Sequence, residues 1–276
     1  MRKVIVVIAK NTSIGEFLRI LDRLNLLSFS RGGPRILIKP NVNTDDPYPG
    51  TSNPDLVREI IRKLYDKGAS EIVVGDSSSI VSMNTRLNMK KIGIEKAALD
   101  AGGRVVAFEE GRWIKIKPDR SKHWRIGFHI PRIVQEFDYL VNLTVIKTHF
   151  LATYTGALKN MVGCIKRLDR IWLHLGNISA KIAEINLAIS PVINILDARK
   201  VFIKGGPRRG ELRDANILIA SKDRVASDAV GLAVLKLMGA RGDIQKLGVW
   251  GQGQIKSAIS LNLGIKSPNE IEIRAF

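Results

Sequence analysis

Cysteine, histidine and long apolar runs are scarce in this sequence. The chain of 276 residues contains one cysteine, Cys164, and four histidines. One cysteine excludes an internal disulfide, and it excludes an iron–sulfur cluster or a zinc site held by four cysteines of this chain. We therefore expect no metal site, leave any cofactor unidentified, and take the cytoplasm as the default compartment.

A membrane-spanning segment is not expected, because no apolar run approaches the roughly 18 residues that a span requires. The first residues, MRKVIVVIAKNTS, include a short apolar stretch after two basic residues. A signal peptide would need a longer apolar core and a cleavage site of small residues. This stretch instead predicts a first β-strand.

Acidic residues are few relative to basic ones. The chain has 44 Lys and Arg against 26 Asp and Glu, a formal net charge of +18 and a pI of about 10.2. Such an excess implies an anionic partner, either nucleic acid, a phosphorylated metabolite or an acidic protein. A generally basic proteome would give the same excess, so the positions of the charges have to decide between these classes.

Apolar runs alternate with helical patterns through the first third of the chain. Strands are expected at 3–9, 35–40, 71–76 and 104–108, and helices at 13–24, 51–70 and 94–103. This rhythm predicts an α/β fold with a mainly parallel sheet flanked by helices. Further strands are expected at 138–146, 192–198, 200–203 and 215–221, and helices at 179–189 and 222–240. We expect one domain over residues 1–276, either a single α/β unit with an insertion or two interleaved lobes.

The segment 111–132 differs from the rest of the chain. It carries seven Lys or Arg residues and one Asp, interleaved with aromatic residues, and it predicts a basic β-ribbon insertion. Aromatic side chains between cations suit stacking on single-stranded nucleic acid. The simpler alternative is a solvated hairpin whose tryptophans pack inward. The candidate nucleic-acid contacts, from this ribbon and from a later turn, are Arg112, Lys115, Lys117, Lys122, Arg125, Arg208 and Arg209.

Polar residues follow one apolar run after another. In open α/β sheets, ligands bind beyond the carboxyl ends of the strands. Any one of these polar clusters alone also fits an ordinary turn or a solvated strand end, but their repetition favours a binding site. The residues in question are Lys39, Asn41, Asp76, Lys147, His149, Asp197, Lys204, Gly206 and Asp223.

The stretch KTHFLATYTGALKN, residues 147–160, is the richest of these clusters. It lacks the G-x-x-x-x-G-K-[ST] spacing of a nucleotide-binding loop. Thr155 and Gly156 can begin a helix whose N-terminus faces an anion, with Lys159 and Asn160 on its first turns. Lys147 would then lie at the preceding strand end, which makes a cationic pocket.

Two of the histidines lie in surroundings that indicate a role. His149 can act as a general acid or base, because imidazole titrates near neutral pH. A histidine hydrogen-bonded in a loop is the alternative. His174 lies among apolar residues in IWLHLGN, which favours a structural role.

Several stretches in order resemble the DUF362 family, a domain of unknown function. They are IKPNVN, TSNPDLVREIIRKLYDKGASEIVVGDS, FDYLVNLTVIKTHFLATYTGALKNMVG, GGPRRGEL and ASKDRVASDAVGLAVL, and they extend from about Ile36 to about Gly253. The resemblance implies relatives that often carry a ferredoxin-like module with cysteine-rich cluster motifs. This chain departs from them, since it has one cysteine, so an electron-transfer role would need a cluster supplied by a partner. The family is also distantly similar to the nickel-pincer lactate racemase group, from which no cofactor is carried over.

The family pattern falls largely on the strand-end residues already selected. Asp223 also fits a helix N-cap, and Asp228 lies within the helix that follows it. The matching positions are Lys39, Asn41, Asp76, Lys147, His149, Thr155, Gly156, Lys159, Asn160, Gly206, Pro207, Asp223 and Asp228.

The leading hypothesis is an enzyme, or a subunit derived from one, that binds a small carboxylate or phosphate. Lysines 39, 147 and 159 would neutralise the anion, and Asn41 and Asn160 would orient it. His149 would move a proton, assisted by Asp76, which could instead coordinate a cation brought by the substrate. Proton-transfer and redox chemistry both stay open, as does whether the chain is itself an enzyme.

Two other classes of function are kept as alternatives. The first is a protein that binds nucleic acid, RNA above all, through residues 111–132 and 199–213. The second segment holds six Lys or Arg residues and one Glu. The other alternative is a subunit that docks an acidic iron–sulfur redox partner.

Overall fold

The computed structural model describes residues 3–30, 32–82 and 84–276. Its centre is an eight-stranded sheet in the order β12-β1-β11-β10-β7-β2-β3-β4. The strands of this sheet are β1 (Val4–Lys10), β2 (Arg35–Lys39), β3 (Glu71–Asp76), β4 (Arg104–Ala107), β7 (Tyr139–Val145), β10 (Ile193–Gly205), β11 (Gly210–Ser221) and β12 (Ile271–Ala275). Strand β11 runs antiparallel to both of its neighbours, and the other adjacent pairs are parallel. The mainly parallel α/β sheet predicted from the sequence is therefore confirmed.

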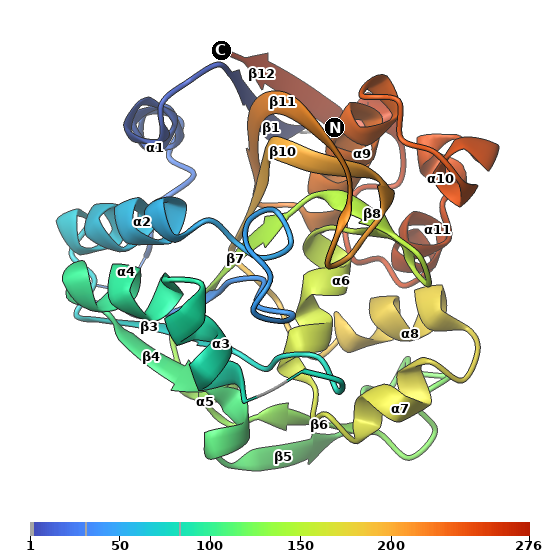
Figure 1. Ribbon diagram of the computed structural model, residues 1–276, viewed down its shortest axis with the longest axis horizontal. Coiled ribbons are helices and arrows are strands. Elements are labelled where there is room, and N and C mark those ends of the chain that lie inside the picture. The colour runs from blue at the N-terminus through green and yellow to red at the C-terminus, as the bar shows by residue number, and fades with distance from the viewer. Residues whose placement is uncertain (1–2, 31, 83) are drawn as a thin grey trace.

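The sheet lies between two layers of helices (Figure 1). One face is covered by α1 (Ile14–Arg23), α2 (Pro54–Asp66), α3 (Thr85–Lys91) and α4 (Ile94–Asp100). The other face is covered by α6 (Ala157–Asn160), α8 (Ile178–Ile185), α9 (Arg224–Leu237) and α11 (Gly253–Ser260). Alternate residues of each strand enter the two cores: Leu37 of β2 packs on one side, and Ile36 and Ile38 pack on the other.

Local sequence explains why the helices begin where they do. The side chain of Ser13 accepts a hydrogen bond from the Glu16 N–H at the start of α1. Asn53 caps α2 in the same way, and Pro54 occupies its first turn. The buried residues of α2 recur at helical spacing along the chain: Leu56, Val57, Ile60, Ile61 and Leu64.

Shorter elements complete the fold. The short helices are α5 (Ile133–Glu136), α7 (Asp169–Leu173) and α10 (Asp243–Lys246), with 3₁₀ turns at Phe108–Glu110, Met161–Cys164, Val249–Gly251 and Pro268–Glu270. Strands β8 (Lys147–His149) and β9 (Thr153–Thr155) pair antiparallel. Strands β5 (Trp113–Ile116) and β6 (Phe128–Pro131), within residues 111–132, pair antiparallel as well. The connection between β5 and β6 is fixed by Glu184 of α8, whose carboxylate accepts hydrogen bonds from the backbone N–H groups of Lys122, His123 and Trp124.

Two strand predictions need correction. The runs at 192–198 and 200–203 are one strand, β10, with an irregular register between Ala198 and Lys200. Asp197 therefore does not follow a strand end; its carboxylate pairs with Arg199 at 2.6 Å. Because β11 is antiparallel, its last residue pairs with Asn194 near the start of β10. Asp223, which follows β11, consequently lies at the edge of the sheet opposite to the carboxyl ends of β2, β3 and β7.

Within the described residues, no helix has the length and apolar character needed to cross a membrane.

Candidate functional site

The strand order reverses between β2 and β7. From β2 the chain continues outward through β3 and β4, and then returns to the other side of β2 with β7. In open α/β sheets, this reversal opens a crevice beyond the carboxyl ends of the strands, where ligands bind. Lys39 ends β2, Asp76 ends β3 and Lys147 follows β7, so all three lie at this edge.

Lys39 and Asp76 form a buried ion pair. The Lys39 Nζ atom lies 2.7 Å from Asp76 Oδ1, and both side chains are almost completely buried. Asp76 Oδ2 also accepts the Val42 N–H at 2.7 Å. Burial raises the pKa of the Asp76 carboxyl, while the neighbouring Lys39 ammonium opposes that rise. This pair fixes the floor of the site, since neither partner can leave without stranding a buried charge.

Gly163 is required beside this pair. A Cβ atom at position 163 would overlap Asp76 Oδ1 and Lys39 Nζ. We expect Gly163→Ala to cost about 1–3 kcal/mol of stability, because overpacking forces the pair apart. Urea unfolding measures this cost, with Gly15→Ala as the matched control, since a Cβ there meets no atom within 4 Å. Equal stability of the two variants would contradict the tight fit.

A chain of buried amides joins the ion pair to the sheet. Asn160 Oδ1 accepts hydrogen bonds from Asn41 Nδ2 at 3.0 Å and Lys39 Nζ at 3.4 Å. Asn160 Nδ2 donates to Asn142 Oδ1 at 2.8 Å, and Asn142 Nδ2 donates to Asn194 Oδ1 at 2.8 Å. Asn142 and Asn194 were missed by sequence reasoning. In the sequence, each of the two is a polar residue within an otherwise apolar strand, and that pattern could have identified them.

Lys147 lies beneath the site and lines neither of the two cavities described below. It is fully buried. Its Nζ donates to Asn41 Oδ1 and Pro49 O at 3.2 Å each, and also to Gly50 O. Burial, with the positive charge of Lys159 nearby, lowers the pKa of Lys147 to about 7. Lys147 therefore supports Asn41 from behind, with no direct path to a ligand in those cavities.

Two adjoining cavities form a cleft at this edge. The inner one, of about 40 Å³, is lined by Lys39, Asn41, Asp76 and Asn160 among others. The outer one, of about 360 Å³, includes His149, His174 and Leu173 in its lining. Four residues line both cavities: Asn43, Lys159, Val162 and Arg170.

Lys159 is the distinctive side chain of this cleft. It is half-buried, and among the residues that the structure describes no hydrogen bond or ion pair joins its ammonium group. Burial, together with the charges of Arg170 and Lys39, lowers the pKa of Lys159 to about 8. The ammonium group is therefore free to pair with an anion that enters the cleft.

Arg170 and Ser77 complete the cleft, and neither is among the predicted site residues. Arg170 is held by carbonyl acceptors, Ser78 O at 2.6 Å and Gly163 O at 3.1 Å among them. Ser77 lines the inner cavity and is 3 % exposed. Within the described part of the chain its Oγ has no hydrogen-bond partner. No motif in the sequence singles out Arg170, whereas Ser77 lies in the strand-end stretch GDSSS.

His149 is held as a neutral ring. Its Nδ1 accepts the backbone N–H groups of Leu151 and Ala152 at 3.1 and 3.2 Å. Burial and the charges of Lys159 and Lys147 hold the pKa of His149 far below its usual range. Because Nδ1 is an acceptor, the ring proton resides on Nε2. His149 is therefore a hydrogen-bond donor at neutral pH.

The N-terminus of α6 is already occupied by a carboxyl group of the protein itself. Asp228 of α9 is fully buried, and its carboxylate accepts the Leu158 N–H at 3.1 Å, the Ala157 N–H and the Tyr154 hydroxyl at 3.2 Å. Gly156 allows this approach, because a Cβ there would overlap Asp228. The prediction that this helix N-terminus faces an external anion is therefore wrong, because the Asp228 side chain occupies that position.

Of the remaining predicted residues, Pro207 and Arg208 line the outer cavity, whereas Asp223, Gly206 and Thr155 line neither cavity. Asp223 caps α9 by accepting the Ala226 N–H at 2.8 Å, on the opposite edge of the sheet. Gly206 lies in the turn between β10 and β11, packed so closely against the Thr148 carbonyl that a Cβ would overlap it. The hydroxyl of Thr155 is buried, and Thr155 lines neither cavity.

The basic surface residues are exposed, but two of the three aromatic residues beside them, Trp124 and Phe128, are buried, while Trp113 is partly exposed. Trp124 is 2 % exposed and Phe128 is fully buried, and the two rings pack at 5.1 Å. These two rings therefore offer no stacking surface for bases. The exposed cations of the ribbon are Arg112, Lys115, Lys117, Lys122 and Arg125. In the later turn, Arg208 pairs with Asp46 at 2.7 Å, and the Arg209 side chain is 90 % exposed.

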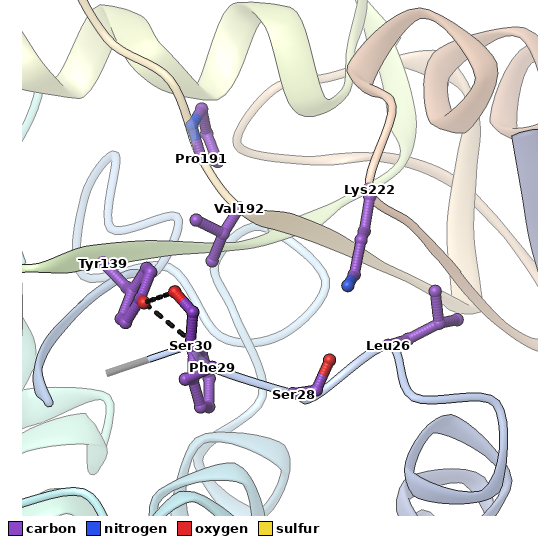
Figure 2. A pocket seen from close by; sticks show the side chains of 8 residues that line it. All are labelled: Leu26, Ser28, Phe29, Ser30, Tyr139, Pro191, Val192 and Lys222. Carbon is purple, nitrogen blue, oxygen red and sulfur yellow. Dashed lines mark hydrogen bonds between the residues drawn. The ribbon is translucent and has the colours of Figure 1, made fainter. Parts of the chain in front are cut away.

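A larger cavity of about 610 Å³ lies at the amino edge of the sheet. Figure 2 shows Lys222 reaching toward it, with Tyr139 and Ser30 opposite. The Tyr139 and Ser30 hydroxyls are hydrogen-bonded at 2.8 Å. Because ligands in this fold class bind at the other edge, we do not place the site here.

No group of three or more His, Cys, Asp or Glu side chains arranged to hold a metal ion occurs in the portion of the chain that is described.

This chain is similar to two known proteins and matches one family model. A curated relative, the thylakoid-associated protein sll1697 of Synechocystis sp., is 27% identical over 219 residues; the match spans 76% of this chain and 65% of the relative's length. A solved structure of the lactate racemase apoprotein from Thermoanaerobacterium thermosaccharolyticum matches with a TM-score of 0.48 and 11% identity, covering 98% of this chain and 82% of that one. The family model of DUF362, a domain of unknown function, matches residues 36–233. Because this match covers well over half of the sequence, the chain belongs to the DUF362 family.

Proposed function

We propose that this protein is an enzyme, or a subunit derived from one, that binds a small carboxylate or phosphate in the cleft beyond β2, β3 and β7. The observation that carries the proposal is Lys159, a half-buried cation that lines both cavities and has no partner among the described residues. Arg170 and the unpaired Ser77 hydroxyl converge on the same cleft. The inner lining holds the charges of Lys39, Lys159 and Arg170 against that of Asp76, an excess that favours an anion.

Each residue has a distinct role in this proposal. Lys159 and Arg170 bind the anion, and Ser77 and Asn43 donate hydrogen bonds to it. Lys39, Asp76, Asn41, Asn160 and Lys147 hold the floor of the cleft in place through the contacts described above. His149 presents its Nε2 proton to the bound ligand.

Lys159 is the group best suited to transfer a proton. Its pKa of about 8 lets it lose and regain a proton near neutral pH, which a lysine at its usual pKa does rarely. His149 cannot accept a proton there, because its pKa is too low and its Nδ1 is engaged. The sequence predicted that His149 transfers a proton. In this proposal His149 instead donates a hydrogen bond to the ligand.

The pH dependence of binding tests the proposal. Propionate, whose charge is constant above neutral pH, should bind most tightly below the pKa of Lys159, about 8. Its affinity should fall as pH rises from about 7 to about 9, because Lys159 loses its proton. Arg170 keeps its charge over this range, since its pKa is lowered only to about 10, and His149 stays neutral.

Isothermal titration calorimetry at several pH values measures this fall, with Lys159→Arg as the control. Arginine keeps its charge throughout, so the affinity of this variant should fall much less over that range, with only the buried Lys147, whose pKa is about 7, still losing its proton nearby. A wild-type affinity that is constant with pH, or an equal fall in Lys159→Arg, would count against the assignment.

A cytoplasmic location stays a prediction. The relative from Synechocystis is named for its association with thylakoids, and the match covers 65% of its length. The nucleic-acid and redox-docking hypotheses also stay predictions. Trp124 and Phe128 are buried, so nucleic acid could not stack on these two rings.

A further inference from the structure

Large apolar side chains stand exposed around the outer cavity. Val81 is 82 % exposed, Phe150 is 71 % exposed and Leu151 is 49 % exposed, and all three line this cavity. Exposed apolar residues gathered at one site differ from the scattered ones found on any surface, and they mark a place where apolar material binds.

Contacts with His149 fix the positions of Phe150 and Leu151. Phe150 stacks on the His149 ring with centroids 5.3 Å apart. The Leu151 N–H is hydrogen-bonded to His149 Nδ1 at 3.1 Å, which fixes the turn between β8 and β9. The Phe150 and Leu151 part of the apolar rim is therefore positioned by the same histidine that lines the outer cavity, so rim and cleft form one site.

Cations line both parts of the cleft, Lys159 and Arg170 in each and Arg208 in the outer cavity, whereas large apolar side chains gather in the outer cavity. The inner cavity is lined by the charged groups Lys39, Asp76, Lys159 and Arg170. The outer lining contains no carboxylate and adds apolar side chains, Leu173 among them. Its volume, about 360 Å³, falls within the roughly 300–1,000 Å³ typical of small-molecule sites.

We infer that the ligand is an amphiphilic anion, whose carboxylate or phosphate group binds Lys159 and Arg170 and whose apolar part covers Val81, Phe150 and Leu151. This inference rests on the proposed function, because it needs the anion at Lys159. It adds the class of ligand: a compact anion alone would leave the apolar rim uncovered.

Calorimetry with methyl, butyl and octyl phosphate tests this inference. Each methylene group that leaves water should raise the affinity, by roughly two- to fourfold per group until the rim is covered. The variant Leu151→Ser should weaken octyl phosphate by roughly tenfold and leave methyl phosphate unchanged. Leu237→Ser, at an exposed leucine on α9, is the matched control and should change neither.

The outcomes separate the two proposals. Equal affinity for the three phosphates, or equal loss in Leu151→Ser and Leu237→Ser, would overturn the amphiphilic ligand while leaving anion binding intact. If Lys159→Ala binds methyl phosphate as tightly as the wild type does, the proposed function itself is wrong. An affinity that rises with chain length and depends on both Lys159 and Leu151 supports both.

Discussion

Replacing Lys159 by alanine is expected to weaken the binding of inorganic phosphate by roughly 10- to 100-fold. A hydrogen bond to a charged group contributes about 1.5–3 kcal/mol, and this ammonium is partly removed from water. No competing partner among the described residues would have to be released, so most of that energy is available to the ligand. The fold should be unaffected, because the variant leaves no hydrogen bond of the described residues broken.

The control for this variant is Lys222→Ala. Lys222 is an exposed lysine that lines the cavity at the opposite edge of the sheet, so it has the same charge outside the proposed site. Calorimetry with inorganic phosphate should show wild-type affinity for Lys222→Ala. Equal losses in the two variants would mean that net charge, and not the cleft, determines binding.

Replacing Asp228 by alanine is expected to destabilise the protein by about 3–5 kcal/mol, which lowers Tm by about 10 °C in a chain of this size. The carboxylate accepts hydrogen bonds from Leu158 N, Ala157 N and the Tyr154 hydroxyl, all of which are buried. Alanine would leave these donors without partners, and each unsatisfied buried group costs about 1–3 kcal/mol.

Two comparisons make this prediction specific. Asp228→Asn keeps one acceptor oxygen and should lose less stability than Asp228→Ala. Asp243→Ala removes a side chain that is 70% exposed and should change stability little. An Asp228→Ala protein as stable as Asp243→Ala would show that Asp228 does not hold α6 against α9.

The pH dependence of stability gives an independent check on Asp228. Burial raises the pKa of its carboxyl from 3.8 to about 7. Between these values the folded state holds a proton that the unfolded state has lost, so this group's contribution to stability falls as pH rises through that range. In Asp228→Asn, the free energy of unfolding measured in urea should no longer carry this part of the pH dependence.

The sequence predicted those parts of the structure that local patterns determine. The spacing of Leu56, Ile60 and Leu64, with the cap at Asn53, is enough to define α2. Likewise, parallel strands bring their carboxyl ends to one edge, so Lys39 and Asp76 could be expected near each other before their ion pair was seen.

Strand direction was the main source of error. An apolar run such as ILIAS reads the same whichever way the strand is oriented, and the antiparallel setting of β11 moves Asp223 to the far edge. The contact between Asp228 and the start of α6 was unpredictable for another reason. It joins residues about 70 positions apart, and nothing local in either segment specifies it.

Arg170 shows a third limit of sequence reasoning. It lies in a stretch with several cations, GCIKRLDR, and only the packing of α7 against Ser78 and Gly163 distinguishes it from Lys166 and Arg167. Burial of a cation is a tertiary property, so the residues that line the cleft could be only partly named in advance.

Native mass spectrometry on protein purified at high salt tests the central claim most directly. The account predicts that the wild type carries a small adduct that is lost on denaturation, and that Lys159→Ala lacks it. An adduct retained equally by Lys159→Ala, or a wild type that carries only nucleic acid stripped by salt, would contradict a small anion bound at Lys159.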